Sequence, residues 1–581
     1  MKEGFRQSMA WLHTWSGLLV GWVLFAMFAT GTSAYFRDDI TLWMKPELHA
    51  AQAHAVPAPQ AAEQAVARLQ AVGEKSPRWF ISLPDAHDPS MRITWAPAPA
   101  PKGDKAPKNQ RRRFDSETLD PATGEPMVKA RETRGGEFLY RFHFDLHYMP
   151  AIWARWIVGA CAMFMLVAII SGIITHRRIF SDFFTFRPRK GQRSWLDGHN
   201  ATAVLALPFH LMITYTGLIT LMFLYMPWGS QTAYKGDEKT FFAEVFPSSN
   251  GNAKPSGERV ALAPIGPMVA RATEHWQGTP PGRITVELPN DANATVVLTR
   301  QSDITVSCKQ PVMRFNGATG EMIGTQGDEL SGAMQTHGVL YGLHVAHFAT
   351  PLIRPLFFLC GLAGCAMVGT GLLLWAVKER QKYAKVLAKG GRVSFGLRLV
   401  DGLNIGAVAG VPLAIAAYFW ANRLLAVDLP ERTAAEIAWF FKAWGFVAVL
   451  GLLRPTRGMW LGLLVLDGLA FALIPVLNAF TTDTHLGVTL LNGPWPVAAF
   501  DLTVLGLGLL FLFSAWMLHK HKPKAKTAKV AKAVKPAAPK VDKATVAPQP
   551  AAATATLADK PAPSRGQPFL DGDGLPEVQG S

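Results

Sequence analysis

Four histidines at the ends of apolar runs are the residues of this sequence best placed to do chemistry. His13 and His199 each begin an apolar run, and in both runs a glycine preceded by threonine follows 18 positions later. His147 and His344 each follow a leucine and precede a further apolar run. Ionisable side chains are costly within a membrane, so histidines in such places indicate a functional site.

The sequence around these histidines is duplicated. The turn DPATGE at 120–125 recurs as NGATGE at 316–321, and Arg155 and Arg354 each lie 17 residues before a glycine. The first two histidines are 186 positions apart and the last two 197, so the difference falls mostly in the polar regions between the runs. We therefore predict a repeated unit of span, soluble module and span, with functional sites at the interface of the repeats.

The composition is typical of a polytopic α-helical membrane protein. Of 581 residues, 49% are hydrophobic, and apolar runs of about 20 residues recur along the chain. The net charge of +16 does not indicate nucleic-acid binding, because lysines and arginines gather in two short loops. Under the positive-inside rule both loops are cytoplasmic. We predict a multi-pass protein of a bacterial inner membrane.

The predicted domains follow from these runs. Residues 1–36 form a retained N-terminal anchor rather than a cleaved signal peptide, and the two modules are expected to be small α+β units that each contain a helix and a hairpin. The tail is rich in Lys, Ala and Pro and cannot bury a core. The full order is span 1–36, periplasmic module 37–142, span 143–177, basic loop 178–198, span 199–227, periplasmic module 228–343, span 344–377, basic loop 378–399, four further spans in 400–518 and a disordered cytoplasmic tail, 519–581.

This topology sorts the four histidines into two facing pairs. His13 and His199 begin outward-going spans at the cytoplasmic edge, whereas His147 and His344 begin inward-going spans at the periplasmic edge. A parallel duplication relates its halves by an axis along the membrane normal, so each pair should face across one four-helix bundle. Two neutral imidazoles from separate helices are the axial ligands of a b-type haem, and no CxxCH motif exists for covalent attachment. We predict two bis-histidine haems b.

Two other readings of these histidines stay open. Zinc usually takes four ligands with help from thiolate or carboxylate, and the nearby carboxylates are those of Asp145 and Asp197. Alternatively, the histidines anchor the spans at the membrane interface. The last four spans contain no histidine, so deleting them is expected to leave the haem content largely intact.

Further residues are second choices for the site. His210 lies three helical turns after His199 on the same face and could be a ligand or a buried core histidine. The two arginines that recur in the repeat, Arg155 and Arg354, could contact haem propionates or lipid phosphates. Other histidines could replace a neighbouring ligand or lie close to one: His143, His347 and His176.

The segments LHTWSGLLVGW, DPATGE, LHYMP with a later ISG, and LHVAHF ending in GTGLLLW resemble the PepSY-associated transmembrane-helix family over roughly residues 5–380. That family includes iron-regulated inner-membrane proteins and ferric-siderophore reductases. The resemblance implies PepSY-like modules, bis-histidine haem b and electron transfer from the cytoplasm to periplasmic ferric iron. By position, the implied ligands are His13, His147, His199 and His344; residues 400–518 are not covered.

The function expected from these features is a transmembrane ferric reductase. Its substrate would be a ferric siderophore or other Fe(III) chelate held between the two modules, because hard siderophore oxygens hold Fe(II) poorly. No GxGxxG follows a strand, so the electron donor would be external, a quinol or a separate cytoplasmic reductase. The alternatives are a quinone-linked haem-b subunit with another periplasmic acceptor, or a haem-free regulator whose modules bind a protein or peptide.

Overall fold

The structure, a computed structural model, describes most of the chain up to residue 521. Much of the predicted basic loop 178–198 and nearly all of the predicted tail lie outside the described residues. The described ranges are 3–49, 56–85, 90–97, 114–127, 129–176, 187, 190–245, 254–301, 305–330, 332–349 and 352–521.

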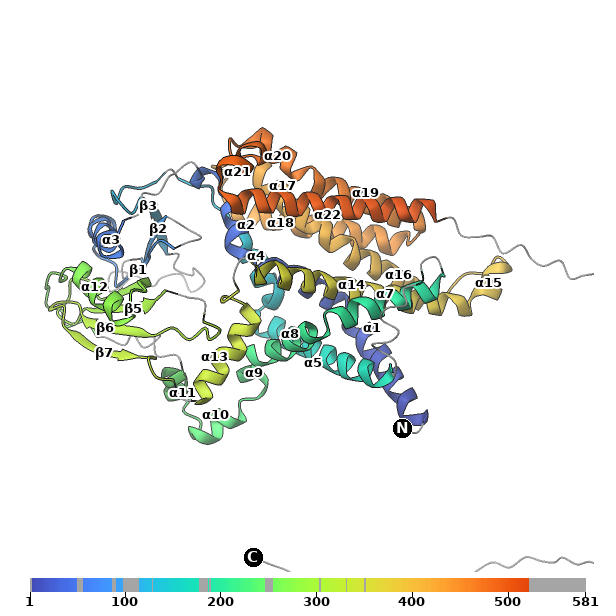
Figure 1. Cartoon of the computed structure of the whole chain (residues 1–581), viewed down its shortest axis with the longest axis horizontal. Coiled ribbons are helices and arrows are strands. Elements are labelled where there is room, and N and C mark those ends of the chain that lie inside the picture. Colours follow the sequence, from blue (N-terminus) through green and yellow to red (C-terminus); the bar gives the residue numbers. More distant parts are fainter. Residues whose placement is uncertain are drawn as a thin grey trace, which may run out of the picture. The chain divides into compact units, whose positions relative to one another are not determined.

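The membrane helices of the duplicated unit are α1 (Glu3–Ala34), α5 (Ala151–Thr175), the pair α7 (Gln192–Leu205) and α8 (Leu207–Thr220), and α14 (Ile353–Lys382) (Figure 1). Helices α7 and α8 meet at an angle of 68°. Pro208 lies in the first turn of α8 and has no N–H to bond the preceding turn, so the helix breaks there.

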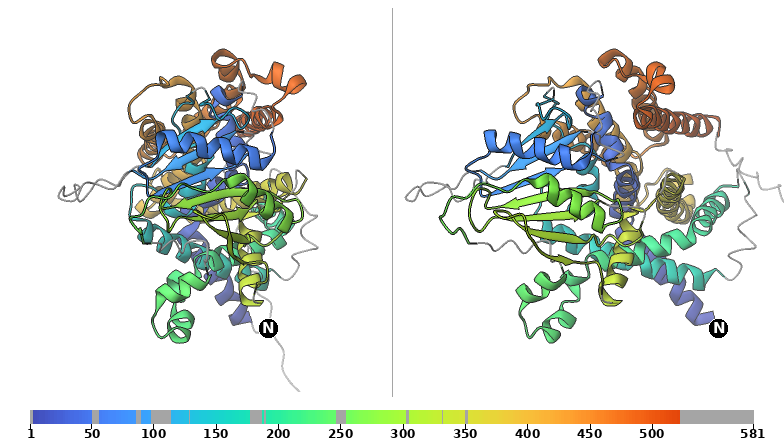
Figure 2. Two further views of the ribbon diagram at one scale, coloured as in Figure 1. Left: turned by 90° about the vertical axis from the view of Figure 1, so that its left-hand side faces the viewer. Right: turned by 60° about the vertical axis from the view of Figure 1, so that its left-hand side comes forward.

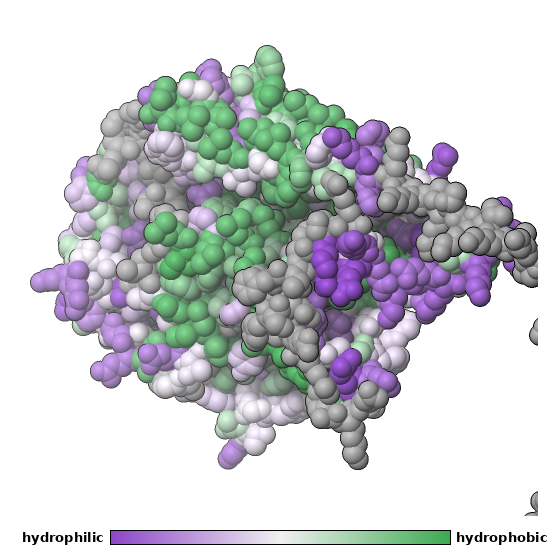
Figure 3. All heavy atoms as spheres, turned by 45° about the vertical axis from the view of Figure 1, so that its right-hand side comes forward, coloured by the Kyte–Doolittle hydropathy of each residue, from purple (hydrophilic) through white to green (hydrophobic). Residues whose placement is uncertain are grey.

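The remaining spans are α16 (Phe395–Val408) with α17 (Gly410–Leu424), α18 (Arg432–Leu453), α19 (Arg457–Ala472) with α20 (Ile474–Thr481), and α22 (Trp495–Lys520). Within the described residues, seven helices are long and apolar enough to cross a membrane, or eight if the bent pair counts as one span. The eight predicted spans correspond to these. Figure 3 shows a broad apolar area on one face of the molecule, bordered by hydrophilic side chains.

The two soluble modules form one antiparallel sheet rather than two separate units. Its strands are β1 (Arg78–Ser82), β2 (Met91–Trp95), β3 (Asp115–Leu119), β4 (Pro281–Glu287), β5 (Thr295–Arg300), β6 (Val312–Asn316) and β7 (Met322–Gln326), in the order β3-β2-β1-β4-β5-β6-β7. The central pairing joins β1 to β4, with Ile81 opposite Ile284. Each module alone would expose this edge, and pairing covers both edges. The sequence predicted a helix and a hairpin in each module, and the structure adds that the strands of the two modules join into one sheet.

Helices α3 (Ala58–Val72) and α12 (Ile265–His275) cover one face of the sheet (Figure 2). Alternate strand residues such as Trp79 and Ile284 are buried beneath them, as the period of two along a strand requires. The opposite face carries polar side chains, among them Arg92 and Arg283. The duplicated turns have a left-handed glycine in each copy, Gly124 and Gly320, where a tight turn needs one.

Two further helices lead from the sheet back to the membrane helices: α4 (Gly135–Asp145) and α13 (Gly332–Val345). The predicted span 143–177 is interrupted, because α4 ends at Asp145 and α5 begins at Ala151. Leu146, His147 and Tyr148 between them all have left-handed backbones, with φ of 51°, 52° and 45°. The shorter elements are α2 (Arg37–Trp43), η1 (Pro46–Leu48), α9 (Met222–Tyr225), α10 (Trp228–Ala233), α11 (Glu238–Val245), α15 (Ala384–Ala388) and α21 (Leu486–Asn492).

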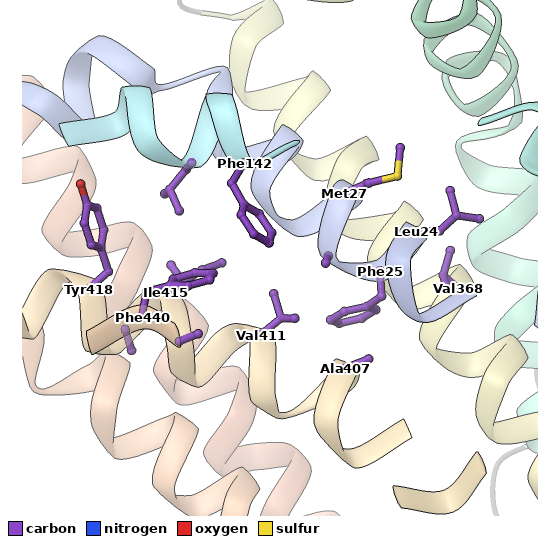
Figure 4. Close-up of a cluster of buried hydrophobic side chains, with 14 of the residues drawn as sticks. Leu24, Phe25, Met27, Phe142, Val368, Ala407, Val411, Ile415, Tyr418 and Phe440 are labelled. Carbon is purple, nitrogen blue, oxygen red and sulfur yellow. The ribbon is translucent and has the colours of Figure 1, made fainter. Parts of the chain in front are cut away.

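Helix α4 is held in place by the last four spans. Phe138 lies 4.9 Å from Tyr418 and 5.1 Å from Phe440, measured between ring centroids, and Phe142 lies 5.4 Å from Phe440. Figure 4 shows Phe142 in one apolar cluster with Tyr418, Phe440 and side chains of α1. The last spans thus support an element of the duplicated unit. The sequence did not indicate this, because those spans contain no histidine.

Candidate functional site

The first histidine pair, called the far pair, consists of His13 on α1 and His199 on α7. Their ring centroids are 6.1 Å apart. Nδ1 of His13 lies 2.8 Å from the carbonyl oxygen of Ala168, and Nδ1 of His199 lies 2.8 Å from that of Met367. A carbonyl can only accept, so each Nδ1 carries the hydrogen and each neutral ring keeps its lone pair on Nε2.

The second pair, called the sheet-side pair, consists of His143 on α4 and His344 on α13. Their ring centroids are also 6.1 Å apart, with an interplanar angle of 32°. Nδ1 of His143 bonds to the carbonyl of Met27 at 2.7 Å, and Nδ1 of His344 to that of Ile213 at 3.1 Å. As in the far pair, the carbonyl partner places the hydrogen of each ring on Nδ1 and leaves the lone pair on Nε2.

Each of the four rings lies against a glycine four residues after the carbonyl that it bonds. A Cβ on any of these glycines would lie 2.6–3.1 Å from the nearest ring atom, so only glycine allows this approach. These are the glycines that marked the sequence repeat: Gly172, Gly371, Gly31 and Gly217. The duplication is thus visible as the same carbonyl–histidine–glycine arrangement at four places.

The prediction that His147 faces His344 is wrong. His147 lies in the left-handed segment after α4 and stacks on Phe441, with ring centroids 5.6 Å apart. His143, predicted as a second choice, takes its place opposite His344. The sequence held the correct register in LYRFH at 139–143 and LYGLH at 340–344, but the Leu-His pair at 146–147 gave a competing one.

The other candidate histidines belong to neither pair. His210 is fully buried on α8, its Nε2 3.4 Å from the carbonyl of Cys360 and its ring edge-on to Phe28 at 6.0 Å. Nε2 of His176 lies 2.8 Å from the side-chain amide of Asn200. Burial, and then the charge of Arg37, lower the pKa of His347, which lines the cavity described next.

A cavity of about 1320 Å³ extends from the sheet-side pair to the face of the sheet that α3 and α12 do not cover. Beside the pair its walls are apolar and come from α1, α5 and α8. Tyr140 and Tyr341, each three residues before a histidine of the pair, also line it. The predicted arginines line it too: Arg155 pairs with Asp145 at 2.8 Å, and Arg354 with Asp39 at 3.3 Å. Their contact with propionates or phosphates stays a prediction.

The two pairs suit a metal ion held between opposed imidazoles. Metal–nitrogen bonds of about 2.0–2.1 Å on opposite sides of one ion put the ring centroids about 6.3 Å apart, close to the 6.1 Å of both pairs. The apolar wall beside the sheet-side pair, which includes Leu24, Met165 and Phe209, suits a porphyrin. Among the described residues no group of three His, Cys, Asp or Glu side chains could hold a metal ion, so the ligands that zinc requires are missing there.

Comparison with known proteins identifies the family of this chain. A family model described as a PepSY-associated TM region matches residues 10–378. The chain belongs to this family. It is also 24% identical over 379 residues to a protein of Pseudomonas aeruginosa that is described as uncharacterized, a match that covers 62% of this chain and 90% of the relative. The family resemblance predicted from the sequence is confirmed, the protein is a multi-pass membrane protein, and its last four spans lie beyond the family match.

Proposed function

We propose that this chain is a haem-b ferric-chelate reductase of the bacterial inner membrane. It takes electrons from an external donor on the cytoplasmic side, a quinol or a separate reductase, and delivers them to chelated Fe(III), such as a ferric siderophore, in the periplasm. The observation that supports this best is the presence of two matched histidine pairs, one of which borders a cavity under the sheet. Lysines and arginines gather at the C-terminal end of α14, away from the sheet, and the positive-inside rule favours the cytoplasm for that side. Both termini would then be cytoplasmic.

The residues that would hold the two haems are His13 with His199 and His143 with His344. Bound haem supplies one-electron chemistry, at a potential set by its axial ligands, their hydrogen bonds and their burial. The carbonyl bond to each Nδ1 fixes the orientation of the ring and increases the basicity of Nε2. Met27, whose carbonyl bonds His143, lies 14 residues after His13 along α1, which is about 21 Å. The two sites would therefore be separated by most of a hydrocarbon core of about 30 Å.

The cavity suits an anionic chelate. Its lining holds eight arginine or lysine side chains and three aspartate or glutamate side chains. Arg92 and Arg283 come from the sheet, and Arg37 comes from α2 on the membrane side. The lining includes residues of both modules, which form one sheet, so a chelate bound there would lie against both of them. Fe(III) prefers hard oxygen ligands more strongly than Fe(II) does, so reduction there favours release of the metal.

The test is a spectrum followed by a reaction. The purified full chain should show dithionite-reducible b-type bands, and an Fe(III) chelate should reoxidise the reduced protein. Arg92→Gln should slow reoxidation by the chelate, whereas Arg141→Gln, on an exposed side of α4, should not. Absence of the bands would remove both haem proposals. Reoxidation by a quinone but not by Fe(III) chelates would favour the quinone-linked alternative.

A further inference from the structure

The last four spans contain a second duplication, independent of the first. Asp401-Gly402-Leu403 on α16 recurs as Asp467-Gly468-Leu469 on α19. In both copies the helix then has a one-residue interruption, at Ala409 and at Leu473, and a proline follows it, while each pair of segments still runs on as one span. Each interrupted span is followed by an uninterrupted one, α18 and α22. Proline- or glycine-interrupted segments at matched positions mark binding sites in many transport proteins.

The contacts within the two copies agree with this repeat. In the first, a Cβ on Gly451 would lie 2.8 Å from the carbonyl oxygen of Gly402; in the second, a Cβ on Gly508 would lie 2.7 Å from that of Gly468. The glycine after each aspartate therefore meets a glycine of the following unbroken helix. Such small-residue crossings allow two membrane helices to approach closely.

The ends of the copies agree as well. Asn422, in the last turn of α17, donates to Glu436 of α18 at 2.9 Å. Asn478, near the end of α20, donates to Asp501 of α22 at 2.9 Å. Both acids are fully buried and have another partner: Arg432 for the first, and the indole N–H of a tryptophan on α2 for the second.

The two copies differ at the aspartate that begins each motif. Asp401 forms a salt bridge with Arg380 of α14. Asp467 is 0% exposed, and neither of its carboxyl oxygens has a hydrogen-bond partner. Leu463, one turn before it, belongs to one buried cluster with side chains of α16, α17 and α18, so Asp467 lies on the face of α19 that points into the bundle.

An ionised carboxylate in such a place would lack both solvent and a counter-charge, and this is the costliest state for the group. A metal ion would need several oxygen ligands, but among the described residues no group of three acid, histidine or cysteine side chains surrounds a possible site. A proton requires no further ligand and removes the charge. We propose that Asp467 is a proton-binding site and that the last four spans take up and release this proton.

The step balances without a redox partner: the carboxyl O–H bond forms when a proton arrives from water and breaks when the proton returns to water. The proline that follows each interruption has no N–H, so one helix hydrogen bond is unmade there, and this is where that water would enter. This proposal does not depend on haem. It assigns a proton-linked activity to the part of the chain that lies outside the family match.

Infrared spectroscopy of the full-length protein in lipid tests the proposal. At neutral pH the wild type should show a protonated-carboxyl C=O band that shifts in D₂O and is absent from Asp467→Asn. Asp401→Asn, at the matched position with a salt-bridge partner, should retain the band. If Asp467→Asn does not insert, Asp467→Glu should keep a protonated band at a shifted frequency.

A proton-flux measurement accompanies the spectra. Proteoliposomes holding a pH-sensitive dye should dissipate an imposed pH gradient faster with the wild type than with Asp467→Asn, which should match empty liposomes. A wild type with no protonated band, a band that persists in Asp467→Asn, or a band insensitive to D₂O would overturn the proposal. Equal flux in wild type and Asp467→Asn would also overturn it.

Discussion

Replacing Gly31 by alanine should weaken the sheet-side site and leave the far site unchanged. The new Cβ would lie 2.6 Å from Nδ1 of His143, whereas optimal contacts between heavy atoms are about 3.5–4.0 Å. The ring must therefore move by about 1 Å, which breaks its 2.7 Å bond to the carbonyl of Met27. Leaving a buried polar group unpaired costs about 1–3 kcal/mol, or about 5- to 150-fold in affinity at that site.

The assay is haem titration together with electron paramagnetic resonance, in which each bis-histidine site gives its own low-spin signal. Gly31→Ala should lose or weaken one signal, and Gly172→Ala, whose Cβ would lie 3.0 Å from the ring of His13, should weaken the other by less. Gly17→Ala is the matched control on α1, because no atom lies within 4 Å of its added Cβ. A Gly31→Ala protein with both signals at wild-type haem affinity would refute the reasoning.

Three further predictions concern the histidines and the packing around them. His143→Ala should empty the sheet-side site while His147→Ala leaves haem content unchanged; the reverse result would restore the register of the Leu-His pairs. Phe440→Ala removes a fully buried ring that packs on α4, so it should cost about 3–5 kcal/mol and weaken the sheet-side signal, whereas the largely exposed Phe446→Ala on the same helix should do neither. Burial lowers the pKa of His49 to about 4, below the unfolded value of 6.5, so stability should fall by up to about 1.4 kcal/mol per unit as pH drops from 6.5 towards 4. Thermal unfolding in detergent across that range should show a weaker pH dependence for His49→Gln, and an unchanged slope would contradict the assignment.

The duplicated sequence predicted the membrane helices and the far pair, because His13 and His199 lie in ungapped copies of one segment. It predicted the wrong partner for His344. Two registers, one from LYxxH and one from the Leu-His pair, were both present, and the left-handed backbone at 146–148 that removes His147 from the helix has no glycine to signal it.

The joining of the modules and the polar contacts of the last spans could not be read from one sequence. Any unpaired strand edge can accept any other, so strand patterns alone do not say that β1 pairs with β4. The bond from Trp43 to Asp501 at 2.9 Å joins residues 458 positions apart, and local periodicity carries no information at that range.

The pairing of β1 with β4 also bears on the origin of the chain. These strands are equivalent in the two halves, PRWFISLP and GRITVELP, and exchanging the halves turns the opposed pair Trp79–Val286 into the opposed pair Ile81–Ile284. This is the contact that a two-fold axis makes between two copies of one subunit. An ancestor with a single copy of the repeated unit could therefore have formed the sheet and both histidine pairs as a homodimer. Each pair would then have consisted of the same histidine from the two subunits. After fusion into a single chain, the two members of each pair could acquire different surroundings. His143 is an example, because it lies on α4, which packs against the last spans.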